Sequence, residues 1–463
     1  MSELAKIFKA YDIRGIVPDQ LDEKVAEAVG AAFVRLTGAT AIVTVHDMRT
    51  SSAALAEAFD RGAAAQGADV VAAGLGSTDM LYYASGSLGI PGAMITASHN
   101  PPKYNGIKLC RSGARPVGRD SGLTELRDAV TGGQAHPAVA PGAVTGRDLL
   151  SGYADKLKSL VDLSGIRPLK VAVDAGNGMA GHTVPKVFAG LPLQVVPLYF
   201  ELDGTFPNHE ANPIDPVNLR DLQRAVTGHG ADLGLAFDGD ADRCFAVDER
   251  GEIVSPSVLT ALIATRELAR EPGAAVIHNL ITSRAVPEII AEHGGRPVRT
   301  RVGHSFIKAD MARTAAIFGG EHSGHFYFRD FWYADSGMLA ALHVLAALGH
   351  QPGDPKPLSQ LLARYTRYRA SGEINSEVAD TEGVTRRVRD AFAGRPGAVL
   401  DEIDGLTVTL PGWWFNLRPS NTEPVLRLNV EAADDATMIA VRDEVLGIVR
   451  RPGNVDERIR RNE

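Results

Sequence analysis

Residues 96–101 read Thr-Ala-Ser-His-Asn-Pro and directly follow an apolar run, Gly-Ala-Met-Ile, at 92–95. The apolar run predicts a short buried strand, and the Pro-Pro pair at 101–102 can continue neither a helix nor a central strand. Ser98 is therefore expected on a loop at the C-terminal edge of a sheet, which is where open α/β sheets bind ligands. A structural turn or a helix cap would also use a serine here, so this loop alone leaves its role open.

Expected helices and strands alternate before this loop. The apolar patterns predict a helix at 23–36, a strand at 41–45, a helix at 51–66 and a strand at 70–72. This alternation is typical of a layered α/β domain.

Changes in composition divide the rest of the chain. A stretch rich in Gly, Pro and Ala at 131–147 indicates a domain boundary, and a Pro/Gly stretch at 351–357 precedes the last mixed segment and suggests a hinge region. We predict an α/β protein with three mixed α/β domains and a smaller C-terminal α+β domain, at residues 1–146, 147–250, 251–365 and 366–463.

Composition limits the class of protein. Of the 463 residues, 44% are hydrophobic and 22% charged, and the net charge of −8 argues against a general nucleic-acid binder. Cys110 and Cys244 are too few for a disulfide framework, and the N-terminus lacks the apolar core of a signal peptide. The longest apolar helix candidate, at 338–348, is too short to span a bilayer. We therefore expect a cytoplasmic protein without nucleic-acid or membrane partners.

An acidic triplet follows the expected strand at 233–237. Its carboxylates stand at every second position, Asp238, Asp240 and Asp242, and such hard oxygen ligands suit Mg²⁺ or Ca²⁺. A calcium EF-hand loop would place glycine where Arg243 stands, and it needs flanking helices where strands are expected here. A solvated acidic turn without a metal is the remaining alternative.

Two later loops are also polar and end expected strands. Residues 319–325 read Gly-Gly-Glu-His-Ser-Gly-His, in which Glu321, Ser323 and His325 could bind vicinal hydroxyls; metal binding by the two histidines is the rival interpretation. Residues 418–424 read Arg-Pro-Ser-Asn-Thr-Glu-Pro, and an arginine with hydroxyls and backbone amides suits a phosphate dianion. An ordinary hairpin turn would explain the last loop equally well.

Three further features could contribute to an anion site. Tyr11 and Arg14 precede a glycine turn near the N-terminus. The turn pair Asn105-Gly106 predicts a hairpin that brings Lys108 back towards the serine loop. His304 opens an expected helix, whose dipole would lower its pKa and suit it to moving a proton, although an ordinary loop histidine would look the same.

In order, spacing and residue type, the four loops at 96–101, 238–243, 319–325 and 418–424 resemble those of the α-D-phosphohexomutase family, over essentially the whole chain. The resemblance implies four domains around one central cleft, an active phosphoserine at Ser98 and one Mg²⁺ ion. It implies that the metal ligands are a phosphoserine oxygen of Ser98 with Asp238, Asp240 and Asp242. It also implies a sugar loop with Glu321 and Ser323, a phosphate loop with Arg418, Ser420, Asn421 and Thr422, and a cleft lined by Tyr11, Arg14, His99, Lys108, Arg243 and His304.

Within the family, the sugar and phosphate loops are most similar to the phosphomannomutase/phosphoglucomutase branch. Phosphoglucosamine mutases typically have Gln after the Glu of the sugar loop and Gly where Asn421 stands. One departure concerns a lysine that this branch often carries just after the strand ending near His278. Here residues 279–284 read Asn-Leu-Ile-Thr-Ser-Arg, and Arg284 is the basic residue of that stretch.

The resemblance implies reversible phosphoryl transfer between O1 and O6 of a hexose phosphate. A phosphorylated Ser98 would donate to the sugar, and a hexose 1,6-bisphosphate would turn over in the cleft. Arg243 and His99 would add positive charge, and Lys108, with His304 as partner, would be the base if nearby cations lower its pKa. A phosphoglucosamine mutase, a metal-assisted phosphatase and a Ca²⁺-binding module remain alternatives. The choice between mannose and glucose, and between monomer and homodimer, stays open.

Overall fold

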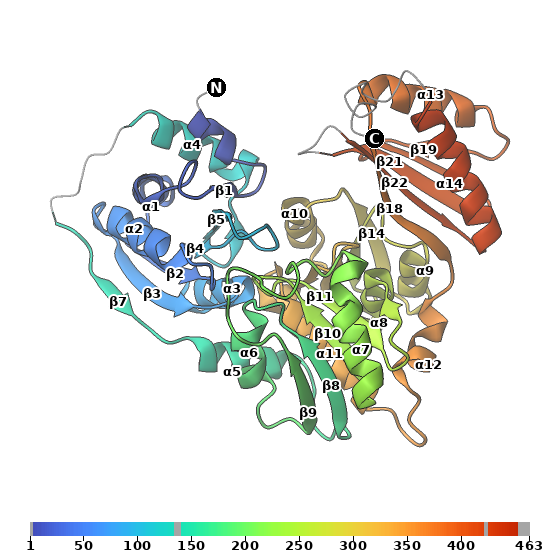
Figure 1. The fold of residues 1–463 in the computed structure, drawn as a ribbon, viewed down its shortest axis with the longest axis horizontal. Helices are drawn as coiled ribbons and strands as arrows, with labels where there is room; N and C mark the ends of the chain where they lie inside the picture. Colours follow the sequence, from blue (N-terminus) through green and yellow to red (C-terminus); the bar gives the residue numbers. More distant parts are fainter. Residues whose placement is uncertain (1–2, 134–139, 421–424, 452–463) are drawn as a thin grey trace.

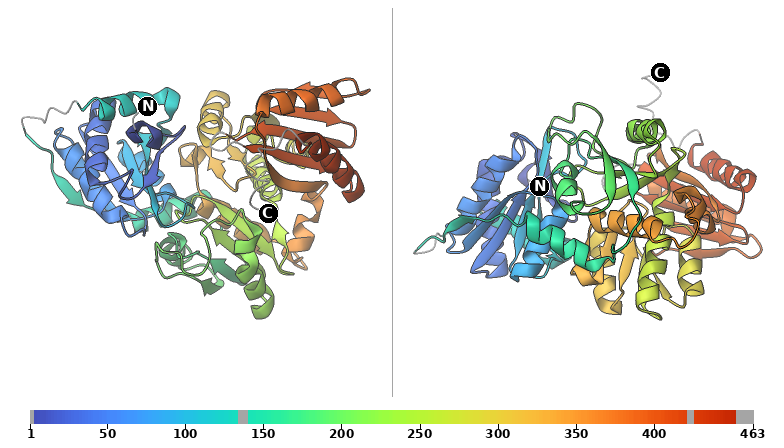
Figure 2. Two further views of the ribbon diagram at one scale, coloured as in Figure 1. Left: turned by 45° about the horizontal axis from the view of Figure 1, so that its top comes forward. Right: turned by 90° about the horizontal axis from the view of Figure 1, so that it is seen from below.

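The computed structural model describes residues 3–133, 140–420 and 425–451, whose strands form four sheets. Each sheet belongs to one of four successive units of the chain. The first and last units lie at opposite ends of the molecule, with the second and third between them (Figure 1 and Figure 2). This confirms the predicted class of three α/β units followed by a smaller α+β unit.

The first unit has a mixed sheet covered by helices on both faces. In spatial order its strands are β1 (Ile13–Ile16), β5 (Tyr104–Arg111), β4 (Gly92–Ile95), β2 (Ala41–His46), β3 (Asp69–Leu75) and β7 (Val144–Gly146), with β6 (Arg115–Pro116) beside β5. One face is covered by α1 (Glu23–Thr37), α2 (Ser52–Ala64) and α4 (Leu123–Thr131), and the other by α3 (Thr78–Leu88). Gly30 and Gly62 allow α1 and α2 to approach closely, because a Cβ on either would lie within about 2 Å of a backbone oxygen of the other helix.

The predicted turn at Asn105-Gly106 is wrong, because both residues lie inside β5. They pair with Gly15 and Arg14 of β1, and a Cβ on Gly106 would lie 2.4 Å from the Ile13 oxygen. This glycine therefore serves a close approach of two strands, which local sequence does not distinguish from a turn. The chain still returns along β5 and brings Lys108 back, as expected.

The second and third units share one continuous core. The second sheet orders β12 (Ile253–Val254), β11 (Cys244–Asp248), β10 (Leu233–Phe237), β8 (Leu169–Asp174) and β9 (Leu193–Leu198), with α5 (Leu150–Leu160), α6 (Ala180–Val187) and α7 (Arg220–His229). The third orders β14 (Arg296–Thr300), β13 (Ala275–Asn279), β15 (Phe318–Gly320), β16 (Phe326–Phe328) and β17 (Ala334–Asp335), with α8 (Pro256–Arg270), α9 (Ala285–Glu292), α10 (His304–Thr314), α11 (Gly337–Gly349) and α12 (Leu358–Leu362). Apolar side chains of both units and of α3 form a single buried cluster, so the loops that end β10 and β15 rest on one packed core.

The last unit is an antiparallel sheet with two helices and a separate core. Its strands run in the order β18 (Arg369–Glu377), β22 (Val425–Ala432), β21 (Trp413–Pro419), β20 (Leu406–Leu410) and β19 (Val399–Asp401), with α13 (Thr381–Ala393) and α14 (Asp435–Val449) packed on it. The sequence pattern did not predict β18, because most of its side chains are polar and at least partly exposed. A separate core favours movement of this unit as one body.

The Pro/Gly stretch at 351–357 does not connect the third and fourth units, so the predicted hinge is misplaced. It lies between α11 and α12, and Leu358, Leu362 and Tyr365, which follow it, are buried in the core of the third unit. The chain crosses to the last unit just before β18 instead.

No helix in the described part of the chain is long and apolar enough to cross a bilayer.

A buried carboxyl, Asp79 on α3, lies where the first three units meet. It accepts hydrogen bonds from Ser77 Oγ, from Tyr153 Oη of α5 at 2.8 Å, and from Ser336 Oγ, which caps α11, at 2.6 Å. Burial raises the pKa of Asp79 to about 7, although these hydroxyls oppose the shift.

Asp79→Asn is expected to remove a pH dependence of stability. The native carboxyl holds its proton up to about pH 7, whereas the unfolded one releases it near 3.8, so the free energy of unfolding falls as pH rises through this window, by about 1.4 kcal/mol per unit. The melting temperature of the variant relative to the parent protein should therefore rise between about pH 4 and 7 and then level off. Asp155→Asn, at an exposed position of α5, should give a flat difference, and a flat difference for Asp79→Asn would contradict the buried protonated state.

Candidate active site

Ser98 lies at the C-terminal end of β4, where a strained backbone presents its hydroxyl to the second unit. Its φ is +50°, and its N–H donates to Thr96 Oγ1 at 2.9 Å. Ser98 Oγ donates to Asp238 Oδ2 at 2.9 Å, across 140 positions in the chain. Gly239 permits this approach, because a Cβ there would lie 2.4 Å from the backbone carbonyl oxygen of Ser98. The first and second predicted loops therefore meet, and non-glycine strain of this kind is typical of functional positions.

The acidic triplet is buried at the end of β10. Asp238, Asp240 and Asp242 are at most 1% exposed, and one carboxylate oxygen of each lies within 4.8 Å of the others. Asp240 Oδ1 accepts no hydrogen bond within the described ranges. Because buried carboxylates require compensation and one oxygen here is unused, the residues fit a divalent cation with oxygen ligands.

Two cations of the protein already contact these carboxylates. Lys108 Nζ lies 2.6 Å from Asp240 Oδ2 and 2.7 Å from Asp242 Oδ2, and Arg243 Nη2 lies 2.8 Å from Asp238 Oδ2. Burial disfavours the charge of Lys108, but the two carboxylates outweigh it and raise its pKa. Lys108 could act as a base only if nearby cations lowered its pKa. In this structure its nearest charged neighbours are carboxylates, which raise the pKa instead.

His99 lies beside the serine hydroxyl, with Nδ1 3.2 Å from Ser98 Oγ. Burial and then the neighbouring Arg243, Arg14 and Lys108 hold its pKa well below the ordinary value. The expected positive charge on His99 is therefore absent near neutral pH, and the ring acts here as a neutral hydrogen-bonding group.

Arg14 lies beside the serine loop, and Tyr11 contacts the third unit. Arg14 donates to Asn100 Oδ1 of the serine loop and to Asp12. The Tyr11 ring packs edge-on against Phe306 of α10, with centroids 6.4 Å apart, and Tyr11 Oη lies where a side chain on Gly303 would have to fit. Arg14 thus contacts the serine loop and Tyr11 the start of α10, and their place in a ligand cleft stays a prediction.

The polar loop after β15 is organised around a buried Glu321. Tyr327 Oη donates to Glu321 Oε2 at 2.8 Å, and the Gly303 N–H donates to Oε1 at 3.3 Å. Ser323 Oγ lies 3.4 Å from Glu321 Oε2 and 3.0 Å from His325 Nδ1. The loop therefore gathers the three predicted polar side chains.

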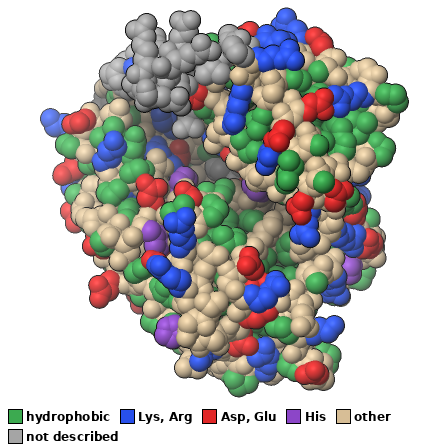
Figure 3. Space-filling view, turned by 45° about the vertical axis from the view of Figure 1, so that its right-hand side comes forward, with side chains coloured by type: hydrophobic (Ala, Val, Ile, Leu, Met, Phe, Trp, Pro, Cys, Tyr) green, Lys and Arg blue, Asp and Glu red, His purple; other side chains and the backbone are tan. Residues whose placement is uncertain are grey.

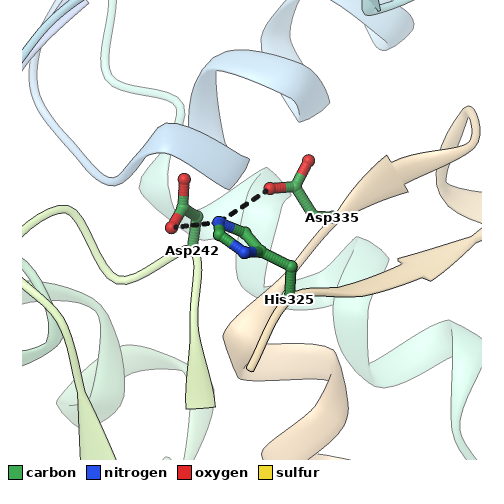
Figure 4. Close-up of side chains that lie close together, drawn as sticks. All are labelled: Asp242, His325 and Asp335. Carbon is green, nitrogen blue, oxygen red and sulfur yellow. Dashed lines mark ion pairs between the residues drawn. The ribbon is translucent and has the colours of Figure 1, made fainter. Parts of the chain in front are cut away.

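His325 connects this loop to the acidic triplet. Its Nε2 lies 3.4 Å from Asp242 Oδ1 and 4.0 Å from Asp335 Oδ2, as Figure 4 shows. Burial opposes its charge, but Asp242, Asp335 and Glu321 together raise the pKa of His325. Asp335 itself pairs with the buried Lys308 at 2.7 Å, so this second acidic group is already neutralised by the protein.

The end of β21 contributes a buried arginine, and the residue after the strand is a serine. Arg418 is 6% exposed, and its Nη2 lies 2.6 Å from Glu373 Oε2. Ser420 Oγ accepts from Arg427 Nη2 at 3.2 Å. Asn421 and Thr422, also predicted here, lie outside the described residues, as does the side chain of His304.

Sequence reasoning missed Arg49, which supports the serine loop. Its guanidinium donates four hydrogen bonds to backbone oxygens, of Ser98 and Asn100 through Nη2 and of Pro101 and Tyr104 through Nη1, at 2.6 to 3.0 Å. It is 3% exposed and pairs with Asp47 at 3.3 Å. In the sequence Arg49 is a single arginine after an expected strand, 49 positions before Ser98, and nothing in that stretch indicates a contact with the serine loop.

Arg284, the basic residue in the stretch that lacks the family's lysine, lies at the boundary between the third and last units. Its guanidinium lies 5.9 Å from the Tyr368 ring centroid, and its backbone N–H donates to Glu431 Oε1 at 2.9 Å. These contacts join the third unit to the fourth. They show no contact between Arg284 and the serine, acidic or polar loops.

Figure 3 shows a hollow in the surface in which Lys or Arg and His side chains are visible. A hollow in which cationic side chains are visible suits an anionic ligand.

Four family models match the chain in succession. They are described as the phosphoglucomutase/phosphomannomutase alpha/beta/alpha domain I at 5–135, domain II at 151–251, domain III at 255–368 and C-terminal domain at 373–448. Together they account for most of the 463 residues.

Proteins of similar length match over nearly the whole chain. Phosphohexose mutases of Xanthomonas campestris are 42% identical over 446 residues, covering 96% of this chain and 99% of that protein. A phosphomannomutase of Escherichia coli is 40% identical over 455 residues, with 96% and 99% covered. The crystal structure of a phosphoglucomutase/phosphomannomutase family protein of Burkholderia thailandensis superimposes with a TM-score of 0.88 at 33% identity, covering 97% of this chain and 98% of that one.

Proposed function

The chain belongs to the phosphoglucomutase/phosphomannomutase family and is an isomerase that acts on hexose phosphates, and from its site we propose a phosphoserine mechanism. Phosphorylated Ser98 donates its phosphoryl group to mannose 1-phosphate or glucose 1-phosphate. The resulting hexose 1,6-bisphosphate reorients, and the other phosphoryl group returns to Ser98, giving the 6-phosphate. Each bond from phosphorus to serine oxygen that breaks is replaced by one to a sugar oxygen, so no water is consumed.

The observation that carries this proposal is the contact between Ser98 Oγ and Asp238 at 2.9 Å. A serine used only as a turn would not be held against a buried triplet of carboxylates. Mg²⁺ held by Asp238, Asp240 and Asp242 with a phosphoserine oxygen would withdraw charge from the reacting phosphoryl group. Arg243 orients Asp238, and Lys108 holds Asp240 and Asp242 in place.

The remaining loops position the sugar. Glu321 and Ser323 bind hydroxyls that both orientations of the sugar present. Arg418 and Ser420, with Asn421 and Thr422, bind the phosphate that is not reacting. The proton of the attacking hydroxyl passes to His325, which contacts Asp242, with His304 as a further candidate. Lys108, which its two carboxylate neighbours hold charged, keeps its proton. Tyr11, Arg14 and His99 complete the cleft wall.

Movement of the last unit accompanies reorientation of the intermediate. Its core is separate from that of the other units, and the bonds across the boundary are polar, such as Val302 N–H to Asp404 Oδ2 at 3.1 Å. Polar interfaces of this kind allow opening and closing. We also propose a cytoplasmic location, with which the two buried free cysteines agree.

The proposal is tested by ³¹P NMR with Mg²⁺, a trace of hexose 1,6-bisphosphate, and mannose 1-phosphate or glucose 1-phosphate in parallel. We expect conversion to the 6-phosphate without free phosphate, and loss of conversion when the metal is removed with EDTA and not replaced. The ratio of the two rates gives the preferred sugar. Release of inorganic phosphate would instead identify a phosphatase, and conversion of glucosamine phosphate alone would identify a phosphoglucosamine mutase.

A further inference from the structure

Glu373, on β18, pairs with two arginines of the last unit, Arg418 and Arg427. Its Oε2 lies 2.6 Å from Arg418 Nη2, and its Oε1 lies 3.1 Å from Arg427 Nη1. Each carboxylate oxygen thus accepts from a different guanidinium. The Arg427 group also donates to Ser420 Oγ, which belongs to the proposed phosphate loop. The carboxylate therefore uses donors that a phosphate oxygen would use.

A bulge in β18 directs the side chain of Glu373 towards the two arginines. The pairing of β18 with β22 shifts between Ala370 and Glu373, and Gly372 there has a φ of +70°. Ser371 Oγ accepts from the Val430 N–H at 3.0 Å and holds the bulge in place. Bulges redirect side chains next to functional sites, so the position of Glu373 is built into the sheet.

A carboxylate at this point has opposite effects on the free and the occupied site. In the free enzyme it pairs with two cations, one of which, Arg418, is 6% exposed. A bound phosphate dianion would share the same guanidinium groups with Glu373, and two anions at such separation repel each other. The side chain of Glu373 is 22% exposed, so this repulsion is only partly screened by solvent.

We propose that Glu373 is an internal counter-ion that competes with the substrate phosphate for Arg418 and Arg427 and thereby weakens phosphate binding in the last unit. The inference rests on the proposed function, in which this loop binds the phosphate that is not reacting. A mutase must release that phosphate once per cycle so that the sugar can reorient. Binding that is equally tight at every stage would slow this step without accelerating phosphoryl transfer.

The test compares Glu373→Gln with the parent enzyme in the presence of Mg²⁺. Calorimetry should show glucose 6-phosphate binding about tenfold more tightly, because glutamine keeps the shape and removes the like charge. Mutase assays should show a lower KM together with a lower kcat, since release of the phosphate becomes slower. Glu373→Asp, which keeps the charge, should lie nearer to the parent enzyme in both measurements.

Controls separate competition from support of the fold. Glu382→Gln, at an exposed position of α13 in the same unit, should leave both constants unchanged. Weaker binding by Glu373→Gln would overturn the inference, because it would mean that Glu373 only positions the arginines; unchanged binding would overturn it as well.

Failure of the inference is distinguishable from failure of the proposed function. Arg418→Ala should weaken glucose 6-phosphate binding by at least tenfold, and unchanged binding would remove the phosphate site and with it the role of Glu373. Turnover of the parent enzyme in the ³¹P NMR assay tests the mutase reaction itself and does not depend on either variant.

Discussion

Ser98→Ala is expected to lower kcat/KM of the mutase reaction by about 10⁴-fold or more, because no other side chain then carries the phosphoryl group. The variant should still fold. The Ser98 backbone makes the bonds that order the loop, through its N–H to Thr96 Oγ1 and its oxygen to Arg49 Nη2, and alanine retains both. Serine already adopts a φ of +50° here, so the backbone strain is similar for alanine.

The measurement combines the ³¹P NMR assay with intact-protein mass. The parent protein, after treatment with hexose 1,6-bisphosphate, should gain the mass of one phosphoryl group, and Ser98→Ala should not. Ser87→Ala, at an exposed position of α3 in the same unit, should keep both turnover and phosphorylation. Turnover retained by Ser98→Ala would exclude the phosphoserine route.

Arg49→Met should destabilise the fold by about 3–5 kcal/mol, the range found when one partner of a buried ion pair is removed. The substitution leaves Asp47, which is 1% exposed, without its cation, and it removes donors from four backbone oxygens of the serine loop. Denaturant unfolding measures the loss, and mutase turnover should fall with it because the loop carries Ser98.

A double-mutant comparison identifies the cause. Asp47→Asn with Arg49→Met should be less destabilised than the sum of the two single variants, because no unpaired buried charge remains. Arg61→Met removes an arginine that is 53% exposed and lies 3.6 Å from Glu27, so it should change stability by less than about 0.5 kcal/mol. A loss below about 1 kcal/mol for Arg49→Met would contradict the supporting role.

The parts of the site that could be predicted from the sequence are those whose residues lie together in a short stretch of the chain. Ser98 follows an apolar strand and precedes two prolines, and the acidic triplet spans five positions after another strand. Such local patterns predict both the loop and the edge of the sheet on which it lies. The glycine at 106 shows the limit of this reasoning, because the same residue type serves a turn and a close approach of strands.

Residues that act across long separations could not be found this way. Thr78 donates to Asp240 at 2.5 Å across 162 positions, and Glu373 reaches Arg418 across 45. Neither lies in a distinctive stretch, and β18 itself has no apolar alternation. Only the packing of the units against one another shows which of the many polar residues contact the site.

The sequence by itself therefore determined the order of four units, the loops that end their strands and the chemical character of each loop, since strand, turn and ligand types depend on neighbouring residues. The tertiary structure alone decided the charge of those groups. His99 is neutral because it is buried and lies near three cations, which lower its pKa. Lys108 is held charged by two carboxylates from another unit. A pKa depends on burial and on the field of nearby charges, and distant parts of the chain supply both only after folding.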